Sequence, residues 1–413
     1  MISPFYNTIC PADVYLKEKK EMTDKEKDEK FFGRGNPAME LEVIKAEGSY
    51  IYGADGKKYV DFLGGAGVGN LGWGVQEIED AIRNKERPSY VYPNFRYKPW
   101  TELAELLAEL TPNHLVKSYR MTGGSEAVEA ALEMATMYTG RKKIVSIEGS
   151  YHGNTMGALS IGASKKQKPF PNLLQGCEKI ELPLNEEKLK HLEELLSSNH
   201  VAAVIMEPVI INLGVIIPEK EFMSGLNRIC KATGTLLIMD EAITGFGRTG
   251  KMFASEHFDI QPDILCMAKA ITAGHAGMGA VITSEEIDKK VGGKIGLYSS
   301  YGWHPVAVDA SLAALHFLQE NRERLFENIR QLEETFKKGI SGVEFAESPE
   351  VRIIGAAIGI DLKDEDYASE VKEKALQNGL LINTEGSSLL FLPNFQMSAE
   401  TAVEGIELLK TCV

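Results

Sequence analysis

Cysteine is scarce in this chain of 413 residues, which contains only five. Cys10, Cys177, Cys230, Cys266 and Cys412 are odd in number and lie far apart. A disulfide framework needs paired cysteines, and a zinc or iron–sulfur site needs closely spaced ones. The sequence therefore predicts neither a disulfide-stabilised protein nor a metal site.

The sequence also lacks a long apolar run and an excess of positive charge. No stretch has the length and apolarity of a membrane-spanning helix, and the N-terminus MISPFYNTICPADV has neither the basic region nor the apolar core of a secretion signal. The net charge is −14 at pH 7, which argues against nucleic acid and anionic membranes as partners. Together these absences predict a globular protein of the cytoplasm.

Two short apolar runs that end in charged residues form the most informative stretch. Residues 236–239 precede Asp240, and residues 264–268 precede Lys269. Such runs are typical of buried strands, and open α/β sheets bind ligands at the carboxyl ends of their strands. We therefore expect Asp240 and Lys269 at one sheet edge. An amine and a carboxylate placed in this way suit pyridoxal 5'-phosphate (PLP), which binds a lysine as a Schiff base and places its ring nitrogen against a carboxylate. Each residue taken alone also fits a solvated surface position.

The whole stretch resembles the active-site signature of the class III (ω-type) aminotransferases, which are PLP enzymes of fold type I. The resemblance is carried by DEAITGFGRTGKMFA, residues 240–254, and by HFDIQPDILCMAKAITAG, residues 257–274. It implies that Lys269 is the Schiff-base lysine, which also moves the proton during transamination, and that Asp240 faces the ring nitrogen. It further implies that Ala242 lies under the ring, where the family commonly has valine.

A second part of the site is predicted at a glycine-rich turn before a helix. Residues 122–125, TGGS, open into a run of strong helix formers, and Gly140 is a natural stop. A helix N-terminus suits an anion such as phosphate, although an ordinary N-cap serine explains the same pattern. GGSEA at residues 123–127 resembles the SGSEA phrase of the family, which implies that Gly124 and Ser125 bind the phosphate of PLP.

The resemblance assigns two further positions to the cofactor. Tyr151 stands where an aromatic residue of the family stacks on the PLP ring. Ser300, in SYGWHP, stands where the family supplies a hydroxyl to the phosphate of the neighbouring subunit, which implies a homodimer with active sites at the subunit interface. We interpret His152 as a structural histidine in a tight turn, because the lysine already supplies the base.

The predicted substrate depends on an arginine that the chain lacks. Glutamate-using members of the family hold the α-carboxylate with an arginine near the C-terminus, and Leu390 stands in its place. Glu207, which pairs with that arginine in such enzymes, then has no obvious partner. We therefore predict a donor whose reacting carbon bears no carboxylate, namely an ω-amino acid, a diamine or a simple amine, and a keto acid such as pyruvate as acceptor. Arg96 is a candidate for binding an acid group elsewhere on the substrate.

Other reactions stay open at this point. The same scaffold hosts PLP-dependent epimerases, aminomutases and decarboxylases, so a fold does not determine the reaction. A non-catalytic PLP-binding module is disfavoured because Lys269, Asp240 and Glu207 are all present.

The predicted fold class is α/β of fold type I, with a large domain of mostly parallel sheet flanked by helices and a smaller α/β domain formed from both chain ends. We place the N-terminal arm and hairpin at residues 1–65, the large PLP-binding domain at 66–305 and the C-terminal small domain at 306–413. The charged residues 17–30 are expected to form a solvated helix face or a mobile arm. Residues 351–362 are expected to form a strand.

Overall fold

The computed structural model describes residues 22–35 and 38–413. The chain forms two compact units, Met1–Glu42 and Val43–Val413. In the first unit, helix α1 (Asp24–Phe31) begins with a capping box, in which the Thr23 hydroxyl accepts the Glu26 amide and the Glu26 carboxylate accepts the Thr23 amide. No residue of α1 is buried. The described part of the charged segment is thus a solvated helix, as predicted, while residues 17–21 lie outside the described residues.

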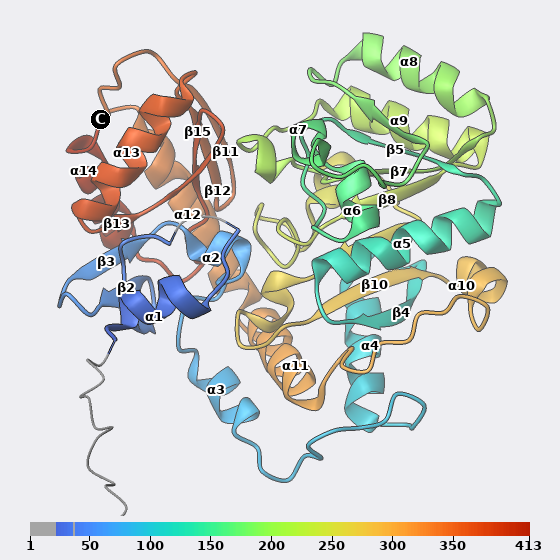
Figure 1. The fold of residues 1–413 in the computed structure, drawn as a ribbon, viewed down its shortest axis with the longest axis horizontal. Helices are drawn as coiled ribbons and strands as arrows, with labels where there is room; N and C mark the ends of the chain where they lie inside the picture. Colours follow the sequence, from blue (N-terminus) through green and yellow to red (C-terminus); the bar gives the residue numbers. More distant parts are fainter. Residues whose placement is uncertain (1–21, 36–37) are drawn as a thin grey trace, which may run out of the picture. The chain divides into compact units, whose positions relative to one another are not determined.

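The second unit is built on a seven-stranded sheet with the strand order β4-β10-β9-β8-β7-β5-β6 (Figure 1). All neighbours from β9 to β6 are parallel, and β10 is antiparallel to both of its neighbours. The sheet is therefore mostly parallel, as predicted. Its strands are β4 (Leu115–Met121), β5 (Lys143–Ile147), β6 (Cys177–Ile180), β7 (Val201–Met206), β8 (Leu236–Asp240), β9 (Ile264–Met267) and β10 (Gly279–Ser284).

Helices cover both faces of this sheet. In β7, Ala203 and Ile205 pack on the side of α5 (Gly124–Thr139), whereas Val204 and Met206 pack on the side of α8 (Glu186–Ser197) and α9 (Lys220–Thr233). Burial on both faces explains why the central strands are apolar at nearly every position. None of the helices in the described residues is long and apolar enough to cross a bilayer. The other helices of this part are α2 (Gly64–Gly67), α3 (Gln76–Ile82), α4 (Lys98–Leu110), α6 (Met156–Ile161), α7 (Ser164–Gln167), α10 (Glu285–Val291), α11 (Pro305–Glu320) and the 3-10 helices η1 (Ile211–Leu213), η2 (Ala254–Phe258) and η3 (Lys269–Thr272).

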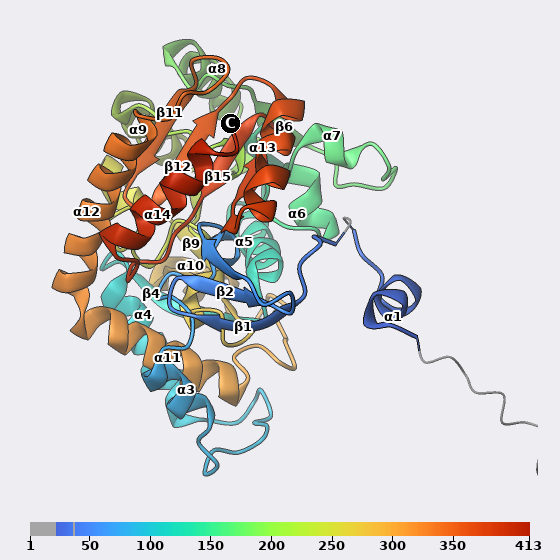
Figure 2. The same ribbon diagram turned by 90° about the vertical axis from the view of Figure 1, so that its left-hand side faces the viewer.

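Segments from both ends of the second unit share one core. Phe62 lies 5.0 Å from Phe336 and 5.4 Å from Phe391 between ring centroids, and a parallel pairing joins β13 to β3. Figure 2 shows the blue strands β1 and β2 beside the red C-terminal elements. This is the smaller α/β part that the fold class predicts, while the domain boundaries near residues 65 and 305 stay a prediction. One sheet contains β1 (Val43–Glu47), β2 (Tyr50–Gly53), β3 (Lys58–Asp61) and β13 (Leu380–Leu381), and another contains β11 (Glu350–Ile354), β12 (Ala357–Asp361), β15 (Ser388–Phe391) and β14 (Asn383–Glu385). The helices here are α12 (Arg322–Ile340), α13 (Glu365–Gln377) and α14 (Ala399–Lys410).

The prediction of one strand at residues 351–362 is wrong. The segment folds into a hairpin of β11 and β12, with Ile354 paired with Ala357. The chain turns at Gly355, whose φ is +57°, a backbone conformation that glycine adopts without steric cost. The turn contains no polar residue, since Gly355 is followed by the buried Ala356. The apolar run therefore continues through the bend.

Candidate functional site

The sheet places Asp240 and Lys269 at one edge. Strands β8 and β9 are parallel neighbours in which Asp240 pairs with Cys266, and Lys269 follows two residues after β9 ends. A cavity of about 210 Å³ opens at this edge. It brings together most of the residues that the sequence singled out, since its lining consists of Gly124, Ser125, Tyr151, His152, Gly153, Glu207, Asn212, Asp240, Ala242, Ile243, Ala268 and Lys269.

Lys269 is held in an unusual environment for an amine. Its φ of +50° lies in the left-handed region, which costs a residue with a side chain about 1 kcal/mol. Burial lowers the pKa of its ammonium, and this effect prevails over the nearby carboxylates of Asp240, Glu207 and Glu385, which favour the charged form. Lys269 is therefore biased toward the neutral amine, the form that can act as nucleophile or base.

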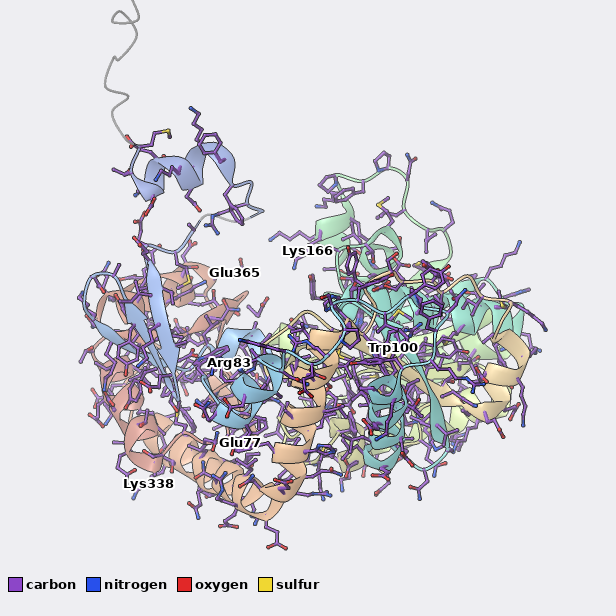
Figure 3. All side chains as sticks on the ribbon, turned by 90° about the horizontal axis from the view of Figure 1, so that it is seen from below. Glu77, Arg83, Trp100, Lys166, Lys338 and Glu365 are labelled. Atoms are coloured by element: carbon purple, nitrogen blue, oxygen red, sulfur yellow. The ribbon has the colours of Figure 1, made fainter. Side chains whose placement is uncertain are left out.

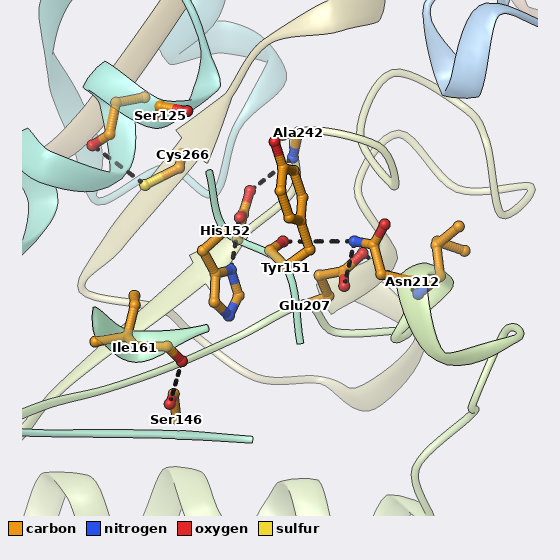
Figure 4. A network of polar contacts seen from close by, with 12 residues as sticks. Ser125, Ser146, Tyr151, His152, Ile161, Glu207, Asn212, Ala242 and Cys266 are labelled. Carbon is orange, nitrogen blue, oxygen red and sulfur yellow. Dashed lines mark hydrogen bonds and ion pairs between the residues drawn. The ribbon is translucent and has the colours of Figure 1, made fainter. Parts of the chain in front are cut away.

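Asp240 is fixed by two hydrogen bonds, to Ala242 and to His152, both of which are labelled in Figure 4. Its Oδ1 accepts the Ala242 amide at 3.1 Å, and its Oδ2 lies 2.8 Å from Nδ1 of His152. Because a carboxylate only accepts, Nδ1 carries the proton in this pair. The interpretation of His152 as a structural residue rather than a base stays a prediction, and the structure adds that its buried ring lines the cavity and contacts Asp240. Its position just after β5, a strand of the same sheet, was the available signal.

The phosphate candidates lie at the start of α5. The helix begins at Gly124 with Gly123 as its N-cap, so the interpretation of Ser125 as an N-cap is wrong. The Ser125 hydroxyl instead accepts the amide of Asn154 at 3.3 Å. Gly153 approaches Ser125 so closely that an added Cβ would lie 2.3 Å from its Oγ. The packing leaves the first turn of α5 open toward the cavity, where its unpaired amides suit an anion.

Tyr151 lines the cavity and is contacted by two side chains that do not, Asn154 and Lys166. The Asn154 side chain donates to the Tyr151 hydroxyl at 2.9 Å, and the ammonium of Lys166 lies 5.0 Å from the Tyr151 ring centroid. Burial raises the pKa of the Tyr151 phenol, so the phenol stays neutral near pH 7. The ring is thus an uncharged flat surface beside the lysine and the carboxylate.

Glu207 does have a partner, which the sequence did not reveal. Asn212 Nδ2 donates to its Oε1 at 2.9 Å, and the amide of Ile211 donates to its Oε2 at 3.3 Å. Burial and the charge of Asp240 nevertheless raise the pKa of Glu207 to about 7. Asn212 follows Glu207 by five residues in the sequence.

Three other candidates lie outside the cavity lining. Arg96 and Ser300 are exposed, and this chain does not bring either of them to the cavity. Leu390 is buried in β15 among apolar residues, with 3% of its surface exposed. The roles of Arg96 and Ser300 stay predictions.

Comparisons with known proteins agree with this geometry. The family model "Aminotransferase class-III" matches residues 31–413. An acetylornithine aminotransferase from Archaeoglobus fulgidus is 34% identical, over 93% of this chain and 98% of the relative. A LysW-aminoadipate semialdehyde/glutamate semialdehyde transaminase from Sulfolobus acidocaldarius is 33% identical, over 90% of this chain and 94% of the relative. The crystal structure of a PLP-bound amine transaminase from an uncultivated Pseudomonas species is similar with a TM-score of 0.84 and 29% identity, over 92% of this chain and 98% of that chain.

Proposed function

The chain belongs to the class III aminotransferases, which are PLP-dependent enzymes, and from this premise we propose that it transfers the amino group of an ω-amino acid, a diamine or a simple amine to a keto acid such as pyruvate. One observation carries the choice of donor. None of the described residues that line the cavity is an arginine, and Leu390 is buried where the family's carboxylate-binding arginine is expected. A carboxylate on the reacting carbon would therefore lack a two-pronged cationic partner.

The residues of the cavity fit PLP. The open N-terminus of α5 with Ser125 suits its phosphate, and the carboxylate of Asp240, oriented by the contact with His152, suits a protonated ring nitrogen. The close approach of Gly153 to Ser125 leaves no room for a side chain that would cover this place. When bound, PLP supplies a ring that accepts electrons from the donor carbon.

We assign the remaining roles to side chains that the cavity brings together. Lys269 Nζ would hold the cofactor covalently, and its neutral amine could take a proton from the donor carbon. Asp240 would stabilise positive charge at the ring nitrogen, and Tyr151 and Ala242, which line the same cavity, would contact the ring. The pair of Glu207 and Asn212 forms the polar wall that the substrate meets.

The names of the relatives support the same donor class. A semialdehyde carries an aldehyde at one end and an acid at the other, so the transaminase relative from Sulfolobus acts at a carbon without a carboxylate. We extend this property to the present chain. We also propose that it works in the cytoplasm as a homodimer, with Ser300 reaching the phosphate of the partner's site.

A panel of donors tests the proposal. The holoenzyme is mixed in single turnovers with L-glutamate, L-alanine, β-alanine, γ-aminobutyrate and putrescine, and loss of the visible absorbance of the Schiff base is followed. We expect faster conversion with donors that lack an α-carboxylate, and no conversion with Lys269→Ala. Rapid conversion by glutamate alone would overturn the donor assignment.

Acceptor use is measured in the same enzyme by comparing pyruvate with 2-oxoglutarate. This arm also separates transamination from the alternative reactions. An epimerase, aminomutase or decarboxylase would form product from the donor without consuming either keto acid.

A further inference from the structure

A cation lies at the edge of the proposed substrate cavity. Lys166 belongs to the four-residue helix α7, and its ammonium lies 5.0 Å from the ring centroid of Tyr151, which lines the cavity. In Figure 3, Lys166 is at the margin of the part built on the seven-stranded sheet, on the side turned toward the C-terminal elements. None of the roles proposed above for the residues of the cavity involves this ammonium group.

The backbone that carries Lys166 is anchored on both sides. Ser164 donates its amide and its hydroxyl to the carboxylate of Glu148, at 2.8 and 2.6 Å. The Gln167 side chain donates to the carbonyls of Leu159, Ser160 and Gly162 at 2.8 to 3.0 Å. The base of the Lys166 side chain is thus held in place even though the side chain itself is exposed.

The charge on this side of the cavity is arranged for an anion. Glu385, at the end of β14, is half-buried, and burial raises the pKa of its carboxyl, while the charges of Lys166, Lys372 and Lys269 act against that shift. The charges of Lys166 and Lys372 thus both act on one half-buried carboxyl, although neither lysine forms an ion pair with it among the described residues. Their combined charge exceeds that of Glu385, so a second carboxylate is attracted here and a second ammonium is repelled.

We propose that Lys166 is a specificity-determining residue, whose ammonium binds the distal carboxylate of the substrate and selects an ω-amino acid over a diamine. The inference rests on the proposed function and narrows it to one of its donor classes. Arg96, the candidate from the sequence, is exposed and does not line the cavity, whereas Lys166 contacts a residue of the cavity wall.

The test compares two donors of equal length, γ-aminobutyrate and butylamine, which differ only by the carboxylate. In Lys166→Met, the ratio of kcat/KM for γ-aminobutyrate to that for butylamine should fall about 10-fold or more, which is the loss of one charge-assisted hydrogen bond. The fall should appear in KM for γ-aminobutyrate rather than in kcat. Lys166→Arg should restore most of the ratio. Lys165→Met removes an exposed lysine of the same helix and should leave the ratio unchanged.

A binding measurement separates this inference from the proposed function. Calorimetric titration of the holoenzyme with butanoate, which cannot react, should give a weaker Kd in Lys166→Met than in the wild type and in Lys165→Met. An unchanged Kd and an unchanged donor ratio would overturn the role of Lys166. Failure of every donor without an α-carboxylate in the wild type would overturn the proposed function, while the butanoate titration would still decide whether Lys166 binds a carboxylate.

Discussion

At the scale of single residues, the contact between His152 and Asp240 fixes the orientation of the carboxylate in the site. Both side chains are buried, with 3% and 4% of their surface exposed, and a buried carboxylate is costly unless it is hydrogen-bonded. His152 Nδ1 and the Ala242 amide supply those bonds. His152 is therefore a positioning residue that acts through Asp240, and its Nε2 has no hydrogen-bond partner among the described residues.

This role predicts a graded effect of substitution at His152. His152→Leu should retain PLP but lower kcat about 10-fold or more, because a hydrogen bond to a charged group contributes roughly 1.5–3 kcal/mol. His152→Asn, whose Nδ2 can replace Nδ1, should recover part of the loss. Single-turnover rates and PLP content measure both effects. Equal activity in the two variants would show that the ring only fills space.

Glu207 predicts a pH-dependent change in stability. Folding raises its pKa from an ordinary value near 4.5 to about 7, so its contribution to stability is complete below pH 4.5 and is lost as the pH rises to about 7. Glu207→Gln cannot ionise and escapes this loss. The free energy of unfolding of the variant, relative to the wild type, should rise by roughly 2–3 kcal/mol between pH 5 and pH 8.

Chemical denaturation of the PLP-free protein at the two pH values measures this difference. The matched control is Glu194→Gln, an exposed glutamate on α8, which should show little change between them. A constant difference for Glu207→Gln would mean that this carboxyl ionises in its ordinary range.

At the scale of elements, the loop after β8 explains why the signature of residues 240–254 has its composition. Glu241 is fully buried and accepts bonds from the Thr244 hydroxyl and from the amides of Ala254 and Ser255, at 2.7 to 2.8 Å. These bonds attach the start of the loop to η2. The neighbouring Asp240 faces the cavity instead. Of the two adjacent acids, Glu241 therefore holds the loop and Asp240 belongs to the site.

Helix α5 allows a comparison of its two ends. Gly153→Ala would place a Cβ on Ser125 at the start of the helix, so we expect the dissociation constant for PLP to rise about 10-fold or more. Gly140→Ala affects the other end, where φ is +70° and nothing lies within 4 Å of an added Cβ. This substitution should lower the free energy of unfolding by about 1 kcal/mol without weakening the binding of PLP. Titration of the PLP-free proteins with PLP distinguishes the two variants. Equal affinity of both variants for PLP would contradict the proposed phosphate site.

At the scale of the whole molecule, one buried arginine joins distant parts of the second unit. Arg248 donates to the carbonyls of Ala356 and Pro393, at 2.8 and 2.6 Å, and to the side chain of Asn70. Its guanidinium also lies 5.0 Å from the ring centroid of Phe395. The loop that follows Asp240 is therefore tied to the hairpin of β11 and β12 and to the segment after β15, which couples the site to the C-terminal part of the fold.

The proposed homodimer predicts complementation between two inactive variants. Lys269→Ala lacks the lysine, and the double variant Ser300→Ala, Tyr301→Ala lacks the hydroxyls that we expect to reach the partner's site. Mixed after unfolding and refolding together, the two should regain part of the activity, because a hybrid dimer contains one intact site. Refolding each variant alone is the control. An active holoenzyme that sediments as a monomer would contradict the prediction.

Local patterns were sufficient for the strands that carry the site. Residues buried on both faces of a sheet are apolar throughout, and the residue after such a run lies at the sheet edge, which is why Asp240 and Lys269 could be paired in advance. The glycines around α5 likewise marked its ends. Long-range contacts leave no such pattern. The bond between His152 and Asp240 joins positions 88 residues apart, and the contact of the Lys166 ammonium with the Tyr151 ring joins two different segments of the chain. Local turns that the pattern did not predict paired Glu207 with Asn212 and reversed the apolar run at Gly355, and tertiary packing left Arg96 and Ser300 outside the cavity of this chain.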